Sequence, residues 1–242
     1  MLISSELKKY LTGELFSNGL LVPFGDELEI CKSRLVSLKM LCKDKRVIHF
    51  GCSDHLPLIE KKLENGTYLH EILGKSAQNL VGLDYNNKAI EAMSNIHGYD
   101  HVYTFDLFTG SLPRIITNEK YDYVVMGEIL EHVDNPVNFL QKMQEVFAPY
   151  CEQIIITVPN IASKHRFNCI IQNMECINTD HRYWFTPFTL AKVISRSGMD
   201  VSLIQGTDVV AANFLTKKLV NLRLRKYKLN DCDTLIGIAD LN

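Results

Sequence analysis

Five residues with chemically useful side chains come at or shortly after the ends of apolar segments. Asp84, Asp106 and Glu128 each close such a segment, and carboxylates accept hydrogen bonds from hydroxyl and N–H groups. His132 comes shortly after the segment that Glu128 closes, and His181 follows a later apolar segment. A histidine can take a proton from a hydroxyl near neutral pH. The residue types therefore suit hydroxyl binding and proton transfer, if the fold brings the ends of these segments together.

An earlier apolar segment, residues 45–51, predicts a strand that ends in a tight turn at Gly51. Small residues and a helical pattern follow, so the turn presents backbone N–H groups at a helix N-terminus, which favours anionic or polar ligands. The next segment, residues 79–84, ends in Asp84. An acidic residue at the end of the second strand is placed to hold the two hydroxyls of a ribose. The chain is therefore expected to bind a nucleoside-containing cofactor.

Strands and helices alternate through the middle of the chain. This alternation predicts βαβ units and a parallel sheet with helices on both faces. Right-handed crossovers place the carboxyl ends of the strands at one edge, where ligands bind in open α/β sheets. Further strands are predicted at 102–106, 121–126 and 153–158, and helices at 56–64, 67–73, 87–97, after Pro136 and at 188–197.

The two ends of the chain are predicted as additions to this sheet. Residues 1–44 have an approximate helical stripe and are expected to form a helical cap on a main domain of residues 45–242. Residues 214–229 contain six basic residues and no acidic one. We interpret them as an amphipathic helix that is either exposed to solvent or in contact with an anionic partner, such as a glycolipid or a nucleic acid.

Composition narrows the class of protein. The 242 residues are 46% apolar and 22% charged, as in a globular domain, and the net charge of −2 gives no strong nucleic-acid signal. Seven scattered cysteines without a CxxC pair argue against a disulfide framework or a zinc site and favour a reducing, cytoplasmic location. Charges interrupt the N-terminal residues, so no signal peptide is expected, and no apolar stretch has the length of a transmembrane helix.

With its segments in this order, the chain resembles the class I S-adenosylmethionine-dependent methyltransferases over about residues 45–205. Gly51 stands where that family has its glycine-rich first motif, although Ser53 and His55 occupy places where the family often has further glycines. The segments at 128–136 and 181–187 resemble the branch that includes ubiquinone-biosynthesis O-methyltransferases and many small-molecule and glycan methyltransferases.

The resemblance implies that S-adenosylmethionine is the cofactor and that the sheet is Rossmann-like, with seven mostly parallel strands. The last strand, at 233–239, would run antiparallel. Asp84 stands at the family's ribose-binding acid, and Asp106 stands at its adenine-side acid. The residues expected at the cofactor are Gly51, Cys52, Ser53, Asp84, Tyr85, Asp106, Leu107 and Glu128.

The acceptor is expected to be a hydroxyl of a small molecule or glycan. Methyl transfer from a sulfonium depends mainly on positioning, and a hydroxyl acceptor gains from a general base, for which His132 and His181 are the candidates. No Asn/Asp-Pro-Pro-aromatic sequence follows the fourth strand, which favours oxygen over nitrogen as the acceptor atom. No metal ligand is expected.

Two alternatives stay open at this point. The small-RNA 2′-O-methyltransferases use a similar constellation of glutamates and histidines for a divalent metal. Glu128, Glu131, His132 and His181 could therefore serve a metal-assisted RNA 2′-O-methyltransferase, with both glutamates on one helix face. The altered first motif is also compatible with a non-catalytic S-adenosylmethionine-binding protein.

Overall fold

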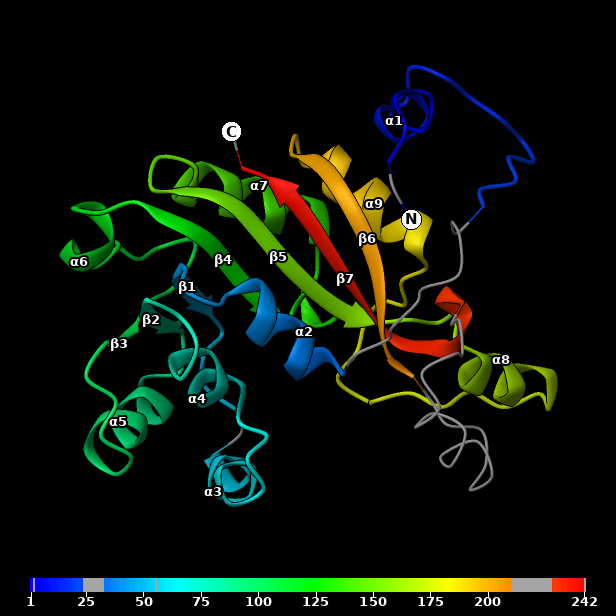
Figure 1. Ribbon diagram of the computed structural model, residues 1–242. Helices are drawn as coiled ribbons and strands as arrows, with labels where there is room; N and C mark the ends of the chain where they lie inside the picture. The colour runs from blue at the N-terminus through cyan, green and yellow to red at the C-terminus, as the bar shows by residue number, and fades with distance from the viewer. Residues whose placement is uncertain (2, 24–32, 55, 210–227, 242) are drawn as a thin grey trace. The chain divides into compact units, whose positions relative to one another are not determined.

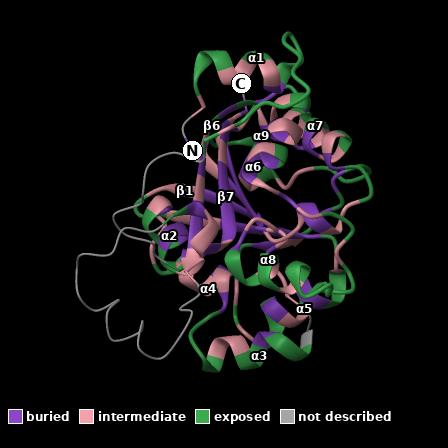
Figure 2. Ribbon diagram, turned by 90° about the vertical axis from the view of Figure 1, so that its right-hand side faces the viewer, coloured by how far each residue is buried: buried purple, intermediate pink, exposed green. Residues whose placement is uncertain are grey.

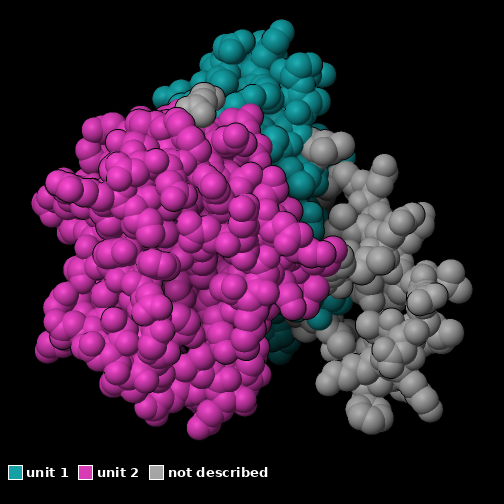
Figure 3. Space-filling view, turned by 60° about the vertical axis from the view of Figure 1, so that its left-hand side comes forward, with its two compact units in different colours: residues 1–34, 128–137, 156–239 teal, residues 35–127, 138–155, 240–242 magenta. Residues whose placement is uncertain are grey.

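The computed structural model describes residues 1, 3–23, 33–54, 56–209 and 228–241. His55 and most of the basic segment 214–229 lie outside these residues, so the interpretation of that segment stays a prediction. The chain forms two compact units (Figure 3). We call residues 1–34, 128–137 and 156–239 unit 1, and residues 35–127, 138–155 and 240–242 unit 2.

Seven strands pair in the order β3-β2-β1-β4-β5-β7-β6 (Figure 1). β1 pairs in parallel with β2 and β4, β2 pairs in parallel with β3, and β7 runs against the direction of β5. The predicted Rossmann-like sheet with an antiparallel last strand is confirmed, and that strand lies between β5 and β6. The strands are β1 Arg46–Phe50, β2 Asn79–Asp84, β3 Val102–Thr104, β4 Tyr121–Gly127, β5 Cys151–Pro159, β6 Asp200–Val209 and β7 Cys232–Asp240.

The apolar runs that predicted these strands reflect burial on both faces of the sheet. Ile48 in β1, Val124 in β4 and Ile155 in β5 are fully buried. Figure 2 shows buried residues concentrated in the strands, whereas α8 is mostly exposed. A parallel strand that is covered on both faces needs apolar residues at consecutive positions rather than at alternate ones.

The helices around the strands of unit 2 follow the predicted pattern. The Asn86 side chain caps α5 by accepting the N–H of Ala89 at 3.2 Å, and Ala89, Ile90 and Met93 are buried as predicted. β3 ends at Thr104, two residues earlier than predicted. The N–H of Phe105 still donates to the carbonyl oxygen of Asp84 at 2.7 Å, and its ring packs against Phe50 and Phe147. The helices are α2 Arg34–Leu41, which begins at the last residue of unit 1, α3 Leu56–Glu64, α4 Leu69–Gly74, α5 Asn87–Asn95, α6 Arg114–Thr117 and α7 Pro136–Phe147, whose first two residues belong to unit 1.

In unit 1, the N-terminal helix α1 (Ser5–Thr12) packs against α9 (Pro187–Arg196). Arg196 donates to the carbonyl oxygen of Thr12 at 3.0 Å, and Thr186 begins α9 with a capping box. The expected boundary between residues 44 and 45 stays a prediction. Among the described residues, no helix is long and apolar enough to span a bilayer. The other helices of this unit are α8 Lys164–Ile171 and the 3₁₀ helices η1 Leu130–His132 and η2 Leu229–Asp231.

Candidate functional site

In unit 2, the turn after β1 is bound to the next strand through its backbone. Gly51 has a φ of 72°, a left-handed conformation that glycine adopts without steric penalty. The N–H groups of Gly51 and Cys52 both donate to the carbonyl oxygen of Leu83, at 2.8 and 3.1 Å. The tight turn predicted at Gly51 is therefore present, and it is held against the end of β2.

Asp84 connects this turn to the start of α5. One carboxylate oxygen accepts the N–H of Ser53 at 3.0 Å, and the other accepts the N–H of Asn86 at 2.9 Å. Asp84 is 5% exposed, whereas the neighbouring Tyr85 is 81% exposed. Because each carboxylate oxygen has two lone pairs, Asp84 can hold these backbone groups and still accept a hydrogen bond at each oxygen.

A buried cluster of ring side chains supports Cys52. The Tyr68 hydroxyl donates to the carbonyl oxygen of Cys52 at 2.9 Å. The rings of His49 and His70 stack, with their Nδ1 atoms 3.1 Å apart. Burial lowers the pKa of His70 to about 4, so this histidine is neutral near pH 7 and acts as a hydrogen-bonding group rather than a charge. Tyr68 therefore fixes the backbone of the turn after β1.

Gly82 in β2 lets this cluster approach the strand. A Cβ atom at this position would lie 2.8 Å from both Cys52 Sγ and His70 Cε1, and 2.9 Å from Val102 Cγ1. Such distances are too short for carbon contacts, so a side chain at residue 82 would displace the turn after β1 or the His70 ring.

Asp106 lies in an exposed turn after β3. One of its carboxylate oxygens accepts the N–H groups of Phe108 and Thr109, at 2.8 and 3.0 Å. These backbone hydrogen bonds lower the pKa of Asp106. Leu107 is only 5% exposed and packs inward. Asp106 therefore organises its own turn, and its expected place beside an adenine stays a prediction.

The strand ends of unit 2 fit a nucleoside-containing cofactor. β1, β2 and β3 are parallel, so their carboxyl ends bring Gly51, Asp84 and the turn at Asp106 to one edge. This edge offers two carboxylates for hydroxyl or N–H donors and a turn in which Gly51 has a left-handed conformation. Glu128, the remaining residue expected at the cofactor, belongs to unit 1.

Glu128 follows β4 in an unusual backbone conformation. Its φ of 57° lies in the left-handed region, which non-glycine residues adopt uncommonly and often at functional sites. Its Oε1 accepts the Thr157 hydroxyl at 3.1 Å, and Thr157 Oγ1 accepts an N–H of Arg34 at 3.5 Å. Burial raises the pKa of Glu128, and the Arg34 charge opposes that shift. The prediction that Glu128 and Glu131 share a helix face is wrong, because Glu128 precedes the short helix η1.

Glu131, on η1, is a fully buried carboxylate with 0% exposure. Neither of its carboxylate oxygens has a hydrogen-bond partner among the described residues. Burial raises the pKa of Glu131 to about 8, and the nearby charge of Glu128 adds to that shift. Burying an ionised carboxylate without partners is strongly unfavourable, so Glu131 in this arrangement requires a proton or a cation.

His132 and His181 lie together beside Glu131. Their ring centroids are 4.6 Å apart and their planes are nearly perpendicular. His181 Nε2 is 3.9 Å from Glu131 Oε1, which is too long for a hydrogen bond. Burial lowers the pKa of His181, and the neighbouring His132 and Arg166 add to that shift, so its ring is neutral near pH 7. The two histidines predicted from the sequence as candidate bases therefore lie next to each other, and Glu131 lies beside them.

Hydrogen bonds hold the segment that carries His181 against the turn after β4. The N–H of Arg182 donates to the carbonyl oxygen of Glu131 at 2.8 Å, and the Tyr183 hydroxyl donates to that of Asp134 at 2.7 Å. His132 Nδ1 lies 3.2 Å from the carbonyl oxygen of Asp180. A carbonyl oxygen only accepts, so this contact puts the proton on Nδ1 and leaves the lone pair on Nε2.

Two residues of this site were missed in the sequence. Thr157 is a polar residue within the apolar run of β5, and that interruption was the available signal. Arg34 lies in the segment assigned to a helical cap, and nothing local marks it as part of the site. It reaches the site because its guanidinium contacts Thr157 from a distant part of the chain.

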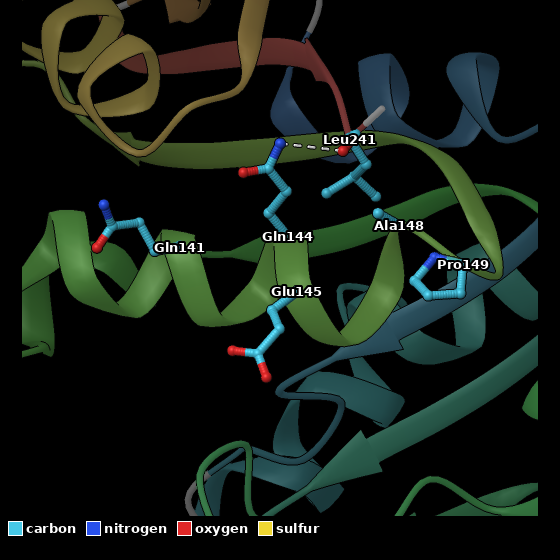
Figure 4. A pocket seen from close by; sticks show the side chains of 6 residues that line it. All are labelled: Gln141, Gln144, Glu145, Ala148, Pro149 and Leu241. Carbon is cyan, nitrogen blue, oxygen red and sulfur yellow. Dashed lines mark hydrogen bonds between the residues drawn. The ribbon is translucent and has the colours of Figure 1, made fainter.

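A shallow hollow of about 580 Å³ in unit 2 belongs to neither group of residues (Figure 4). Gln144 donates to the carbonyl oxygen of Leu241 across it at 3.1 Å. The lining residues are Gln141, Gln144, Glu145, Ala148, Pro149 and Leu241, none of which was expected at the cofactor or the acceptor. The hollow has no part in the chemistry discussed below.

Comparison with known proteins identifies the family. The model of the family described as "Methyltransferase domain" matches residues 27–203, which is more than half of the chain. A possible histamine N-methyltransferase from Thermotoga maritima has a similar fold, with a TM-score of 0.54 and 12% identity over 87% of this chain and 88% of that one. The magnesium protoporphyrin IX methyltransferase of Synechocystis PCC 6803, solved with bound SAH, gives a TM-score of 0.51 and 13% identity over 85% and 81%.

A putative methyltransferase from Bacillus halodurans also shares the fold, with a TM-score of 0.51 and 10% identity over 86% of this chain and 98% of that one. No curated protein matches the chain. Because the identities are low, the solved structures support the fold alone. The assignment of the chain to a family rests on the family model. The chain belongs to the methyltransferase-domain family and is an enzyme of the class I S-adenosylmethionine-dependent methyltransferases.

Proposed function

We propose that this enzyme transfers the methyl group to a hydroxyl oxygen of a small molecule or glycan. The observation that carries the proposal is the meeting of His132 and His181 beside buried Glu131 in unit 1. A hydroxyl must lose its proton on methylation, and neutral imidazoles are suited to assist that loss near pH 7. A nitrogen acceptor with a free lone pair would need no such group.

The bond changes define what the chain must do. S-adenosylmethionine supplies a methyl group bound to a positively charged sulfur. The acceptor oxygen bonds to the methyl carbon, the sulfur–carbon bond breaks with its electron pair remaining on sulfur, and the hydroxyl proton leaves. His181 is neutral because its pKa is lowered, so it can accept that proton, as can Nε2 of His132.

On the cofactor side, Asp84 is proposed to accept hydrogen bonds from the ribose hydroxyls through its remaining lone pairs. The backbone at Gly51, Cys52 and Ser53 forms the turn over which the cofactor would lie. The carboxylate of Asp106 would bind the adenine amino group. Tyr85, Leu107 and Glu128 are the other residues proposed at the cofactor.

The acceptor class follows from charge and from the residues near His181. The net charge of −2 argues against a nucleic-acid acceptor. In unit 1, the Arg166 guanidinium lies over the ring of Trp184 at 5.0 Å from its centroid. A cation and aromatic rings together suit a sugar or an acidic small molecule. The segment 214–229 stays a proposed contact for an anionic partner.

We also propose a cytoplasmic location for the enzyme. In the part of the chain that the structure describes, Cys42, Cys52, Cys151, Cys169 and Cys176 are free thiols. Unpaired cysteines in this number are typical of proteins from reducing compartments.

A methyl-transfer assay with labelled S-adenosylmethionine tests the function. The acceptor panel would contain hydroxyl-rich glycans and small molecules, matched amines and a short RNA. Methylation of oxygen in the first group is expected, with product analysis by mass spectrometry and fragmentation. Methylation of nitrogen or of RNA would contradict the proposed acceptor, and binding of the cofactor without transfer to any acceptor would favour the non-catalytic alternative.

A further inference from the structure

The peptide group between Cys52 and Ser53 is held on both of its polar sides in unit 2. Its carbonyl oxygen accepts the Tyr68 hydroxyl at 2.9 Å, and its N–H donates to an Asp84 carboxylate oxygen at 3.0 Å. We propose that Tyr68 is a positioning residue for the cofactor, because its hydroxyl fixes this peptide group and thereby orients the Asp84 carboxylate toward the ribose. This role rests on the proposed binding of the ribose by Asp84.

The plane of the peptide group transmits the restraint. A peptide group is planar, so its carbonyl oxygen and its N–H cannot turn separately. A rotation that carried the Ser53 N–H away from Asp84 would also break the hydrogen bond from Tyr68. Hydrogen bonds in a chain polarise one another, so the bond from Tyr68 also strengthens the Ser53 N–H as a donor. Loss of the hydroxyl therefore loosens the contact between the turn and Asp84.

The backbone of the turn does not fix this peptide group by itself. Of residues 51–54, Gly51 is the one with a left-handed φ, at 72°, and it lies before the peptide group in question. The N–H groups of Gly51 and Cys52 donate to the carbonyl oxygen of Leu83, but they belong to the two preceding peptide groups. The orientation of the peptide group after Cys52 therefore depends on the hydrogen bonds at its own oxygen and nitrogen.

Neighbouring side chains hold the Tyr68 ring in place. Tyr68 is 2% exposed, and the centroid of its ring lies 6.4 Å from that of His70 and 6.2 Å from that of Tyr99. Burial raises the pKa of Tyr68, so the hydroxyl keeps its proton and acts as a donor. The hydroxyl also lies 3.3 Å from Met93 Sδ. A thioether sulfur is a weak acceptor, so the carbonyl oxygen of the turn is the main acceptor of this proton.

The place of Tyr68 in the chain also favours a role outside its own helix. Tyr68 is the N-cap residue of α4, but its side chain does not cap that helix. Ser, Thr, Asn and Asp are preferred at this position because their side chains accept helix N–H groups. α4 packs against β2 (Figure 1), the strand that ends in Asp84. The helix therefore brings Tyr68 to the cofactor edge without using its hydroxyl for the helix.

The restraint acts before the cofactor binds. With the peptide group held, Asp84 keeps the orientation in which its remaining lone pairs are available to the ribose hydroxyls. Without the Tyr68 hydroxyl, a smaller fraction of the molecules has this arrangement, and the observed affinity falls with that fraction. A hydrogen bond of ordinary strength changes such a population about three- to tenfold.

Calorimetry with two probes tests this role. The probes are SAH, the demethylated cofactor, and its analogue without the ribose 2′ and 3′ hydroxyls. The wild-type protein should bind SAH at least about tenfold more tightly than the analogue. Tyr68→Phe keeps the ring and removes the hydroxyl, so it should weaken binding of SAH about three- to tenfold and leave binding of the analogue unchanged. A merely structural role would lower the free energy of unfolding and leave the preference for SAH as it is.

Tyr99→Phe is the matched control. Tyr99 packs against the same ring cluster, and within the described part of the chain its hydroxyl makes no hydrogen bond to the turn after β1. This variant should bind both probes as the wild-type protein does. An equal loss of SAH affinity in Tyr99→Phe would overturn the specific role of Tyr68.

The outcomes separate the role of Tyr68 from the proposed ribose site. Equal binding of both probes by the wild-type protein would remove the ribose contact of Asp84, and the role of Tyr68 with it. A wild-type preference for SAH that persists in full in Tyr68→Phe would overturn the role of Tyr68 alone, as would equal weakening of both probes. If Tyr68→Phe fails to fold, as judged by circular dichroism, nuclear magnetic resonance of the cofactor-free wild-type protein decides: the Ser53 N–H should exchange slowly with D₂O, and exchange at the rate of an unprotected amide would overturn the role.

Discussion

Replacing Asp84 by asparagine tests the cofactor site at its most connected residue. The carboxylate accepts the N–H of Ser53 at one oxygen and that of Asn86 at the other. An asparagine side chain has one acceptor oxygen and one donor group, so one of these backbone N–H groups would face another donor. An unsatisfied buried donor costs about 1–3 kcal/mol. The free energy of unfolding of Asp84→Asn should fall by that amount in urea denaturation.

The same change should weaken binding of S-adenosylmethionine. A hydrogen bond to a charged acceptor contributes roughly 1.5–3 kcal/mol, so the dissociation constant measured by calorimetry should rise at least about tenfold. The titration is done at a temperature where the unfolding curve shows the variant to be folded. Asp100→Asn, at an exposed aspartate of unit 2, is the matched control and should change neither quantity. Unchanged cofactor affinity in folded Asp84→Asn would remove Asp84 from the site.

Three further predictions concern packing, proton binding and catalysis. Gly82→Ala places a Cβ 2.8 Å from two neighbouring side chains, so its free energy of unfolding in urea should fall by about 1–3 kcal/mol. Gly19→Ala, with open space around its Cβ, is the control. An equal loss of stability in the control would contradict the packing argument. His70 has a folded pKa of about 4 against an ordinary value of 6.5. The unfolded chain therefore binds the proton first, and the contribution of His70 to stability should fall by about 3 kcal/mol as the pH drops from 6.5 to 4. His70→Gln should flatten that part of the curve, and an unchanged curve would refute the assignment. His132→Ala and His181→Ala should lower turnover roughly 10²–10⁴-fold with cofactor affinity intact; full turnover in both would leave positioning alone to explain catalysis.

Local sequence patterns were sufficient to predict where the strands lie along the chain. The apolar runs of β1, β4 and β5 were recognisable because a strand buried on both faces needs consecutive apolar residues. The cap at Asn86 and the inward face of α5 were predictable because capping and helical periodicity depend on residues within a few positions. The turn at Gly51 was predictable for the same reason.

Other features depended on contacts between distant segments. Directly after β3, the ring of Phe105 packs against Phe50 and Phe147, and no local pattern reveals these contacts. β7, predicted to complete the sheet as an antiparallel strand, lies between β5 and β6, because strand order is decided by packing rather than by position in the chain.

The group formed by Glu131, His132 and His181 shows the division most clearly. The sequence alone supplied the residue types Glu131, His132 and His181, because acidic and imidazole side chains are visible in any order of segments. Their burial, their proximity and the absence of hydrogen-bond partners for Glu131 among the described residues came from the tertiary structure. A carboxylate is removed from water only when another segment of the chain covers it. Here that segment carries Arg182, whose N–H donates to the carbonyl oxygen of Glu131.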